Sequence, residues 1–374
     1  MATVRAEPDP ARDHRERTAA SAERRLALGL LAGLFLIAAF HTLRMARALF
    51  LPLALAFLFS LLLKPIVRGL KRIHVPEYIG AALVLVTLLG MLGGAVTMLA
   101  DPAADWIAKA PATLGRIQGK LNALRRPVDQ IGKTADQVEK SVGGDVRAVP
   151  APEVRQPWFK RAAFVGTEAF LSGAVIVIVL VYFLLASGDM FLRKLVRLLP
   201  RSSDKVRAVE ISREIETQVS SYLATVTLIN IGVGLAVGTG VWLLGMPNPA
   251  LWGVLAGLLT YVPYLGAIVG ISVLAVAALL NFDHLGRALA VPGVYVLVSF
   301  FEGNFVTPAI VGKRLALNPV AVFIGLIVWS FLWGVPGLLL AVPILATVRI
   351  FCDHIDHLAF VAEFLGPNSD GNGS

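Results

Sequence analysis

The sequence has little of what disulfide-bonded secreted proteins and soluble enzymes rely on. Its 374 residues include one cysteine, Cys352, which excludes an intrachain disulfide. Charged residues make up only 16% of the chain, whereas soluble domains carry about 25%. We find no Walker phosphate loop, HExxH zinc motif, nucleophile elbow or dinucleotide fingerprint. An enzyme is therefore not indicated, no cofactor is expected, and ATP could drive the protein only through a partner's nucleotide site.

Most of the chain is instead apolar. The chain is 56% hydrophobic and has a mean hydropathy of +0.73, which is typical of a protein with lipid as its solvent. The net charge of +9 does not indicate nucleic-acid binding, because the basic residues flank apolar runs instead of forming one patch. Basic flanks on one side of a membrane account for the charge better.

The apolar runs predict an all-α polytopic membrane protein. About six of them have the length of a full membrane span, and two longer runs are interrupted. The predicted full spans are 26–43, 48–63, 78–100, 164–186, 222–244 and 288–306.

The two interrupted runs, 249–280 and 319–350, are each 32 residues long and almost uncharged. As unbroken helices they would each be about 48 Å long, which exceeds a hydrocarbon core of about 30 Å. Val262–Gly266 interrupts the first run, and Gly334–Gly337 interrupts the second. Each interruption contains a proline, which breaks helical hydrogen bonding. Paired interrupted helices are typical of transporter binding sites.

Basic residues predict the orientation of the spans. They crowd before the first span, after the second, and between the fourth and fifth, so this side is expected to be cytoplasmic. If the interrupted runs are re-entrant hairpins, Lys313 and Arg314 also fall in the cytoplasm, and span-plus-hairpin units form an inverted repeat. If each run is one tilted, kinked helix, both residues fall outside. Either alternative places both termini in the cytoplasm.

These boundaries predict six regions along the chain. In order they are a cytoplasmic mobile N-terminus, the first three spans, an extracytoplasmic helical region, the fourth span with a basic linker, a transport core that contains both interrupted runs, and a cytoplasmic tail. Their limits are 1–25, 26–100, 101–163, 164–221, 222–350 and 351–374.

The extracytoplasmic region carries an apolar stripe. Apolar residues alternate at spacings of three and four, which is the pattern of a helix that packs against another helix. The stripe meets neighbouring subunits in one interpretation, and it packs within one subunit or on lipid in the other. The residues that would form an oligomer contact are Leu114, Ile117, Leu121, Leu124, Val128 and Ile131.

Motifs in the second half resemble those of the autoinducer-2 exporter family. GMPNPALWG at 245–253 is followed by VPYLG at 262–266, and EGNFVTPAIVGK begins at Glu302. GVPGLLLAVP at 334–343 resembles the closing motif of that family. The resemblance covers roughly residues 25 to 355 but does not extend to the 101–163 region.

The resemblance implies a bacterial inner-membrane secondary transporter with elevator-like movement. It also implies a homo-oligomer, with a pentamer suspected. Some members are linked to autoinducer-2 and others to sodium–proton exchange, so the resemblance does not name the solute.

Polar groups and helix breaks inside the spans are the candidates for a solute or ion pathway. Glu302 is a carboxylate in an apolar span, or else a charge near the cytoplasmic interface. Asn230 is either a solute contact or a polar link between helices. The full set is Asn230, Tyr261, Pro263, Tyr264, Gly266, Glu302, Asn304, Pro308, Gly334, Pro336 and Gly337.

The remaining alternatives concern metal binding and function class. Cys352–His357 contains several potential ligands, but a charged helix end leaving the membrane explains them better, and no metal site is expected. Membrane lipid, a small solute and H⁺ or Na⁺ are the expected partners. Export of a small polar or amphipathic solute is the favoured function. Sodium–proton antiport and an oligomeric pore or scaffold are the alternatives.

Overall fold

A computed structural model describes the backbone of residues 10–136, 157–311, 317–355 and 358–366. It describes most side chains in 29–107, 171–310 and 317–366. Every regular element within these ranges is helical, in agreement with the predicted all-α class. The elements are α1 (Pro10–Met45), α2 (Arg47–Arg72), α3 (Glu77–Asp136), α4 (Pro157–Ala186), α5 (Met190–Leu198), α6 (Ser202–Leu243), α7 (Pro249–Leu259), α8 (Leu265–Asn281), α9 (Leu285–Phe301), the π-helix η1 (Glu302–Val306), α10 (Thr307–Val311), α11 (Pro319–Trp333), α12 (Val335–Asp353) and α13 (Ala359–Leu365).

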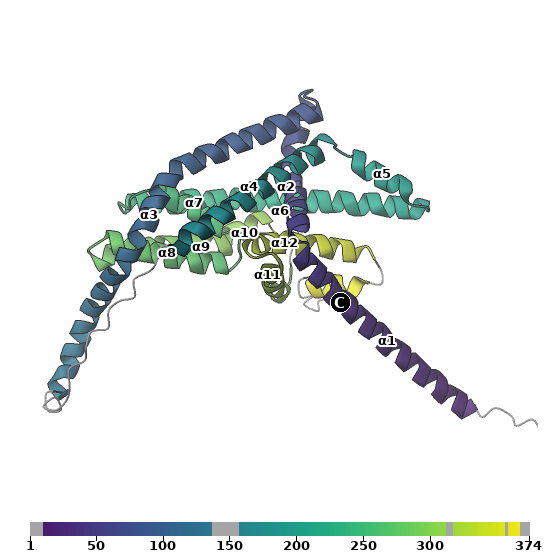
Figure 1. The fold of residues 1–374 in the computed structure, drawn as a ribbon, viewed down its shortest axis with the longest axis horizontal. Coiled ribbons are helices and arrows are strands. Elements are labelled where there is room, and N and C mark those ends of the chain that lie inside the picture. The colour runs from purple at the N-terminus through teal and green to yellow at the C-terminus, as the bar shows by residue number, and fades with distance from the viewer. Residues whose placement is uncertain (1–9, 137–156, 312–316, 356–357, 367–374) are drawn as a thin grey trace, which may run out of the picture.

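Helix α6 organises the molecule. It packs against α7 and α9 towards one end and against α2 and α12 elsewhere, and in Figure 1 it runs horizontally through the middle of the molecule. Its 42 residues correspond to about 63 Å, so it is far longer than one membrane span. The polar segment that precedes the predicted fifth span therefore continues the same helix.

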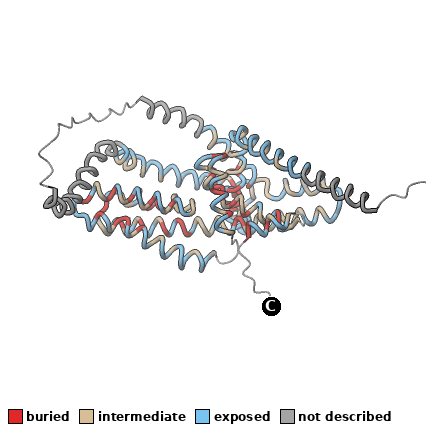
Figure 2. The backbone as a smooth tube through the Cα atoms, turned by 90° about the horizontal axis from the view of Figure 1, so that it is seen from below, coloured by how far each residue is buried: buried red, intermediate tan, exposed pale blue. Residues whose placement is uncertain are grey.

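Three apolar clusters form the core. One joins α6 to α7, α8 and α9, a second joins α2, α3 and α4, and a third joins α2, α6, α11 and α12. Figure 2 shows the buried residues concentrated in an elongated bundle and in the centre of the molecule. Many large apolar side chains outside these clusters are exposed, which suits a surface that faces lipid.

Five described helices are long and apolar enough to cross a membrane. Four correspond to predicted spans, and the fifth, Val335–Asp353, is the second half of an interrupted run. The described apolar parts of the predicted first and fourth spans, Gly29–Met45 and Leu171–Ala186, are shorter. The four corresponding helices are Arg47–Arg72, Glu77–Ile107, Ser202–Leu243 and Leu285–Ile310.

Both interrupted runs end a helix where the sequence predicts. In the first, α7 ends at Leu259 and α8 begins at Leu265, with Tyr264 at a φ of +63°. In the second, only Gly334, at a φ of +67°, separates α11 from α12. Left-handed backbone favours glycine, so Gly334 itself suits the second turn. The two helices of each run pack against each other.

A glycine after each break allows this packing. A Cβ at Gly266 would overlap the Leu259 carbonyl oxygen, and a Cβ at Gly337 would overlap the Trp329 carbonyl oxygen. The two breaks therefore have the same local structure: a glycine after the break lets the second helix start close to the end of the first.

Some predicted features lie outside the described residues. The side chains of the apolar stripe, from Leu114 to Ile131, are not described, and neither are Lys313 and Arg314. The oligomer contact and the side of the membrane that these two basic residues face therefore stay predictions.

Candidate functional site

Helices α6 and α7 approach each other closely because each presents two glycines. Gly234 and Gly238 on α6 oppose Gly253 and Gly257 on α7. A Cβ at Gly253 would lie 2.6 Å from the Gly234 carbonyl oxygen, so even alanine would force the helices apart. Small residues four apart are a common device for packing membrane helices. The two GxxxG spacings are visible in the sequence, but our sequence analysis did not use them.

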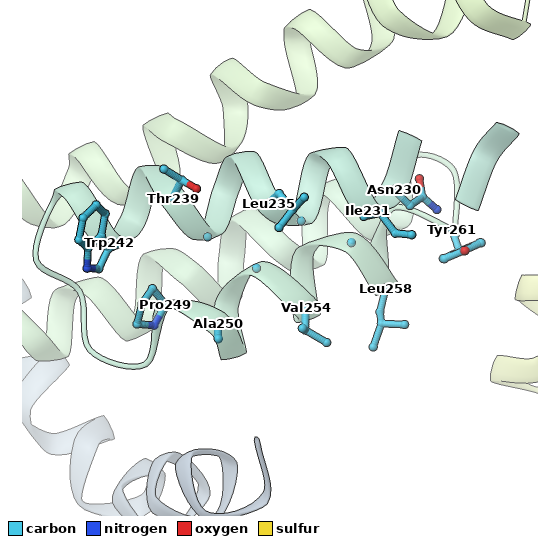
Figure 3. Close-up of a pocket in the computed structure, with 14 residues that line it drawn as sticks. Asn230, Ile231, Leu235, Thr239, Trp242, Pro249, Ala250, Val254, Leu258 and Tyr261 are labelled. Carbon is cyan, nitrogen blue, oxygen red and sulfur yellow. The ribbon is translucent and has the colours of Figure 1, made fainter. Parts of the chain in front are cut away.

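The same pair of helices borders a groove of about 550 Å³. Its α6 wall runs from Asn230 to Trp242, and its α7 wall runs from Pro249 to beyond Leu258 (Figure 3). Ile231, Leu235 and Val254 make the walls mainly apolar. None of the residues that line the groove carries a charge.

Asn230 and Tyr261 supply polar groups at one end of the groove (Figure 3). The Asn230 side chain is only 3% exposed, and its Nδ2 has no hydrogen-bond partner among the described residues. The Tyr261 hydroxyl donates to Thr227 Oγ1 at 2.9 Å. Thr227 in turn donates to the Leu223 carbonyl at 2.7 Å. The structure thus brings together two of the predicted site residues, and Asn230 keeps hydrogen-bonding capacity.

This polar end adjoins the first helix break. Tyr261 lies in the α7–α8 connection, which also contains the predicted residues Pro263 and Tyr264, and Gly266 begins the next turn. Tyr264 is exposed, whereas Gly266 is buried against Leu259.

Tyr295 on α9 is a buried polar residue that the sequence analysis missed. It is 1% exposed, and a Cβ at Gly270 would lie 2.7 Å from its hydroxyl, so Gly270 makes room for the ring. The hydroxyl is buried and has no hydrogen-bond partner among the described residues. The sequence signal was a lone tyrosine in the middle of an apolar span.

Glu302 begins the π-helix η1, and its carboxylate accepts a short hydrogen bond from the Thr307 hydroxyl. The Thr307 amide donates to the Glu302 carbonyl, five residues back. Pro308 has no N–H to offer the Asn304 carbonyl, which favours this wider turn. Asn304 donates through Nδ2 to the Phe300 carbonyl at 2.8 Å, within its own helical segment. Short π-helices are frequent at functional sites, and this one packs on α6.

The second break lies in a different part of the core. Gly334, Pro336 and Gly337 belong to the α11–α12 pair, which packs against α1, α2, α6 and α13. Trp333 donates through Nε1 to the Leu43 carbonyl at 3.2 Å. Within the described residues the two interrupted runs are not extensively packed against each other, and α6 links them.

An ion-pair cluster ties the polar part of α6 to α2. Glu216 accepts from Lys64 Nζ at 2.7 Å and pairs with Arg68 Nη2 at 2.5 Å. Lys64 also reaches Asp189 Oδ1 at 3.2 Å. Burial would raise the pKa of Asp189, but the Lys64 hydrogen bond and the charges of Lys64, Arg68 and Arg193 together lower it. The sequence analysis used these basic residues only for orientation, because their acidic partners are distant in the chain.

The C-terminal stretch Cys352–His357 contains several potential metal ligands. Cys352 is buried, and His354 Nε2 lies 3.0 Å from Glu214 Oε2 on α6. Asp356 and His357 lie outside the described residues. Among the residues that are described, no group of three or more His, Cys, Asp or Glu side chains is arranged to hold a metal ion.

The family model and the relatives that match this chain are all described as transport proteins. Residues 28–357 match the family model described as "AI-2E family transporter". A "Putative transport protein" of Borreliella burgdorferi is 26% identical over 86% of this chain and 86% of its own length. The "Putative transport protein YhhT" of Escherichia coli is 25% identical over 86% of this chain and 89% of its own length. The "AI-2 transport protein TqsA" of Escherichia coli is 27% identical over 82% of this chain and 86% of its own length.

Proposed function

The chain belongs to the AI-2E transporter family, and on this basis we propose that it is a secondary transporter that exports a small polar or amphipathic solute across the bacterial inner membrane. Family membership and the apolar helices support an integral membrane protein. The name of the relative TqsA makes an autoinducer-2-like compound the first solute to test.

The observation that carries this proposal is the groove between α6 and α7, which ends at an interrupted helix. Asn230 and Tyr261 are polar, lie in an apolar region and are close to the connection between α7 and α8. Ends of interrupted membrane helices have unpaired backbone groups, which bind solutes or ions in transporters. Tyr295 and the Glu302–Thr307 pair place further polar groups on helices that pack against the same bundle.

The proposed topology treats both interrupted runs as re-entrant hairpins. Their α7–α8 and α11–α12 pairs are each joined by a short turn with one residue at positive φ, and each has a glycine packed on the preceding helix. The units 222–280 and 288–350 would then form an inverted repeat that moves in an elevator-like manner. The α12 helix, at 19 residues, is also long enough to cross the membrane alone, and this is the competing arrangement.

Sodium–proton antiport is a second candidate function. Glu302 is the observation that favours it, because a carboxylate within a candidate span can exchange a proton for a cation. The Thr307 hydroxyl beside it supplies a further oxygen.

We expect the protein to act as a homo-oligomer, with a pentamer suggested by the family resemblance.

Flux from purified protein in proteoliposomes tests these proposals. Liposomes with outward or inward gradients of protons or sodium would be assayed for efflux of autoinducer-2 and a panel of small metabolites. We expect protein-dependent efflux of at least one compound, and protein-free liposomes provide the background. Sodium-dependent proton movement without organic flux would favour antiport. The absence of both, with correctly inserted protein, would favour the pore or scaffold alternative.

A further inference from the structure

We propose that the groove between α6 and α7 binds an uncharged amphipathic molecule, with its unbranched apolar chain along the groove and its hydrogen-bonding head at Asn230. This inference rests on the proposed transport function and narrows the class of solute. It follows from the shape of the groove, the absence of charge in its lining and one buried amide without a partner.

The length and walls of the groove favour a chain-like apolar body. Asn230 and Trp242 are twelve residues apart on α6, which corresponds to about 18 Å along the helix. Between them, Ile231 and Leu235 line the α6 side of the groove, and Val254 and Leu258 line the α7 side (Figure 3). An extended dodecanoyl chain is slightly shorter than this distance. A compact polar solute would leave most of these apolar walls uncovered.

The glycines explain why the groove is hollow. Gly234, Gly238, Gly253 and Gly257 line it without side chains, so the walls are formed by the larger residues on either side. Because these glycines also bring the two helices together, the depth of the groove depends on the same residues as the helix packing.

Asn230 indicates the chemistry of the head. Its Nδ2 is buried and lacks an acceptor among the described residues, a state that carries a free-energy penalty until a partner is found. An acceptor on a ligand would complete this hydrogen bond once the Asn230 side chain turns its Nδ2 towards the groove. The Tyr261 hydroxyl already donates to Thr227, so it offers an acceptor to a donor on the same head. An amide or hydroxyl head satisfies both groups.

The absence of charge separates this ligand from a bulk phospholipid. No lysine, arginine, aspartate or glutamate lines the groove. A phosphate head would therefore find no cation there, whereas anionic head groups are normally recognised by basic residues. The lining thus favours a neutral head.

A photoaffinity experiment on the full chain tests the proposal without requiring transport. The protein in nanodiscs of phosphatidylethanolamine and phosphatidylglycerol would be irradiated with N-dodecanoylethanolamine that carries a diazirine near the chain end. Adducts would be mapped by mass spectrometry. We expect them on α6 between Ile231 and Trp242, or on α7 between Pro249 and Leu258. Unlabelled N-dodecanoylethanolamine should compete, and N-acetylethanolamine should not.

Matched variants separate the groove from the rest of the apolar surface. Ala250→Trp fills the groove and should reduce adduct formation about tenfold, which is the effect of losing about 1.4 kcal/mol of binding free energy. Ala236→Trp makes the same change at an exposed α6 position outside the groove and should leave labelling unchanged. Asn230→Leu should weaken competition by N-dodecanoylethanolamine about fivefold but leave competition by dodecane unchanged.

Three results would overturn the proposal. Adducts spread over the apolar surface and insensitive to Ala250→Trp would indicate ordinary partitioning into lipid. Equal labelling of the groove by a phosphatidylglycerol photoprobe would identify bulk lipid as the occupant. Absence of adducts together with cross-links between subunits from Ala250→Cys would show that a second copy covers the groove. If any of these three results is obtained and the protein still transports solute in proteoliposomes, the binding site in the groove is rejected but the proposed transport function is not.

Discussion

At the scale of single residues, a cluster of opposite charges joins α2 to α6. Glu216 is 13% exposed and lies between Lys64 and Arg68, so its carboxylate holds two cations of α2 against α6. Lys64 is 21% exposed, which limits solvent screening of that pair, whereas Arg68 is 55% exposed and contributes less. The contact between Lys64 and Glu216 joins residues that are 152 positions apart.

Replacing Glu216 with Gln should destabilise the protein by about 1 to 2 kcal/mol, because Lys64 and Arg68 then repel each other without a shared anion. The melting temperature of the detergent-solubilised protein would be measured by thermal unfolding. Glu210→Gln removes the same charge from an exposed position of α6 and serves as the control. Equal melting temperatures for the two variants would contradict the structural role of Glu216.

The charge of Glu302 can also be tested at the level of a single residue, by its effect on transport. If its carboxylate takes part in ion coupling, Glu302→Gln should flatten the pH dependence of transport in proteoliposomes, since the side chain no longer exchanges a proton. Thr307→Val removes the hydrogen bond to Glu302 but keeps the carboxyl group, so a pH dependence should remain. An unchanged pH profile in Glu302→Gln would assign this residue to helix structure alone.

At the scale of helices, glycine determines how closely neighbouring elements approach. The sequence analysis emphasised Pro263 and Pro336 as helix breakers. The structure adds Tyr264 and Gly334 as the residues with positive φ at the two turns. Pro336 lies in the first turn of α12, where its missing N–H costs little. The second break therefore depends on Gly334 at least as much as on the proline after it.

Two alanine substitutions should have opposite effects on stability. Gly253→Ala places a Cβ against the Gly234 carbonyl oxygen and should destabilise the α6–α7 pair by about 1 to 3 kcal/mol. Gly232→Ala, on α6, meets no atom within 4 Å and should stabilise the helix by up to about 1 kcal/mol. Thermal unfolding of both variants checks the contrast, and a stabilised Gly253→Ala variant would show that the helices are not in close contact.

At the scale of the whole molecule, the arrangement of the two interrupted runs relative to the membrane decides the transport mechanism. The hairpin proposal puts the α8–α9 connection outside the cell, because α7 and α8 would enter and leave from the same side. A single crossing of the first run would put that connection in the cytoplasm. The length of α12 is compatible with a membrane crossing. Labelling of the α8–α9 connection from one side of the membrane distinguishes the two arrangements of the first run.

Cysteine at position 283, in a Cys352→Ala background, should react with an impermeant maleimide added to intact cells. Asp283 is exposed in the short connection before α9, which makes the introduced thiol accessible. Ser203→Cys, in the basic region that is expected to be cytoplasmic, should react only after the membrane is disrupted. Labelling of both positions only after disruption would reject the hairpin and support a single crossing.

Assembly is the second prediction at this scale. If the stripe from Leu114 to Ile131 meets neighbouring subunits, the double change Leu121→Asp and Leu124→Asp should shift the solubilised protein to smaller species in mass measurements, since charge at such a seam prevents packing. Lys120→Asp, one position away from the stripe, is the control for added negative charge. An unchanged mass in the double variant would assign the stripe to a single subunit or to lipid.

Local sequence patterns determined the helical class of this protein, the positions of its candidate spans and its helix breaks. Apolar runs predicted the helical class and the positions of the candidate spans, because helices satisfy their own backbone hydrogen bonds in lipid. Pro263 and Pro336 marked the breaks because the effect of a proline on helical hydrogen bonds acts within one turn. The family motifs also predicted the membership that the comparison supports.

The tertiary structure decided which of these residues meet. Asn230 and Tyr261 line one groove only because four glycines let α6 and α7 approach, and the pairing of their surfaces depends on helix rotation and register. Glu216 finds Lys64 only when α6 packs on α2, and Tyr295 is buried only because Gly270 leaves room for its ring. Contacts of this kind join segments far apart in the chain, whereas hydropathy and helix breaking are properties of neighbouring residues, so only the folded arrangement reveals the groove.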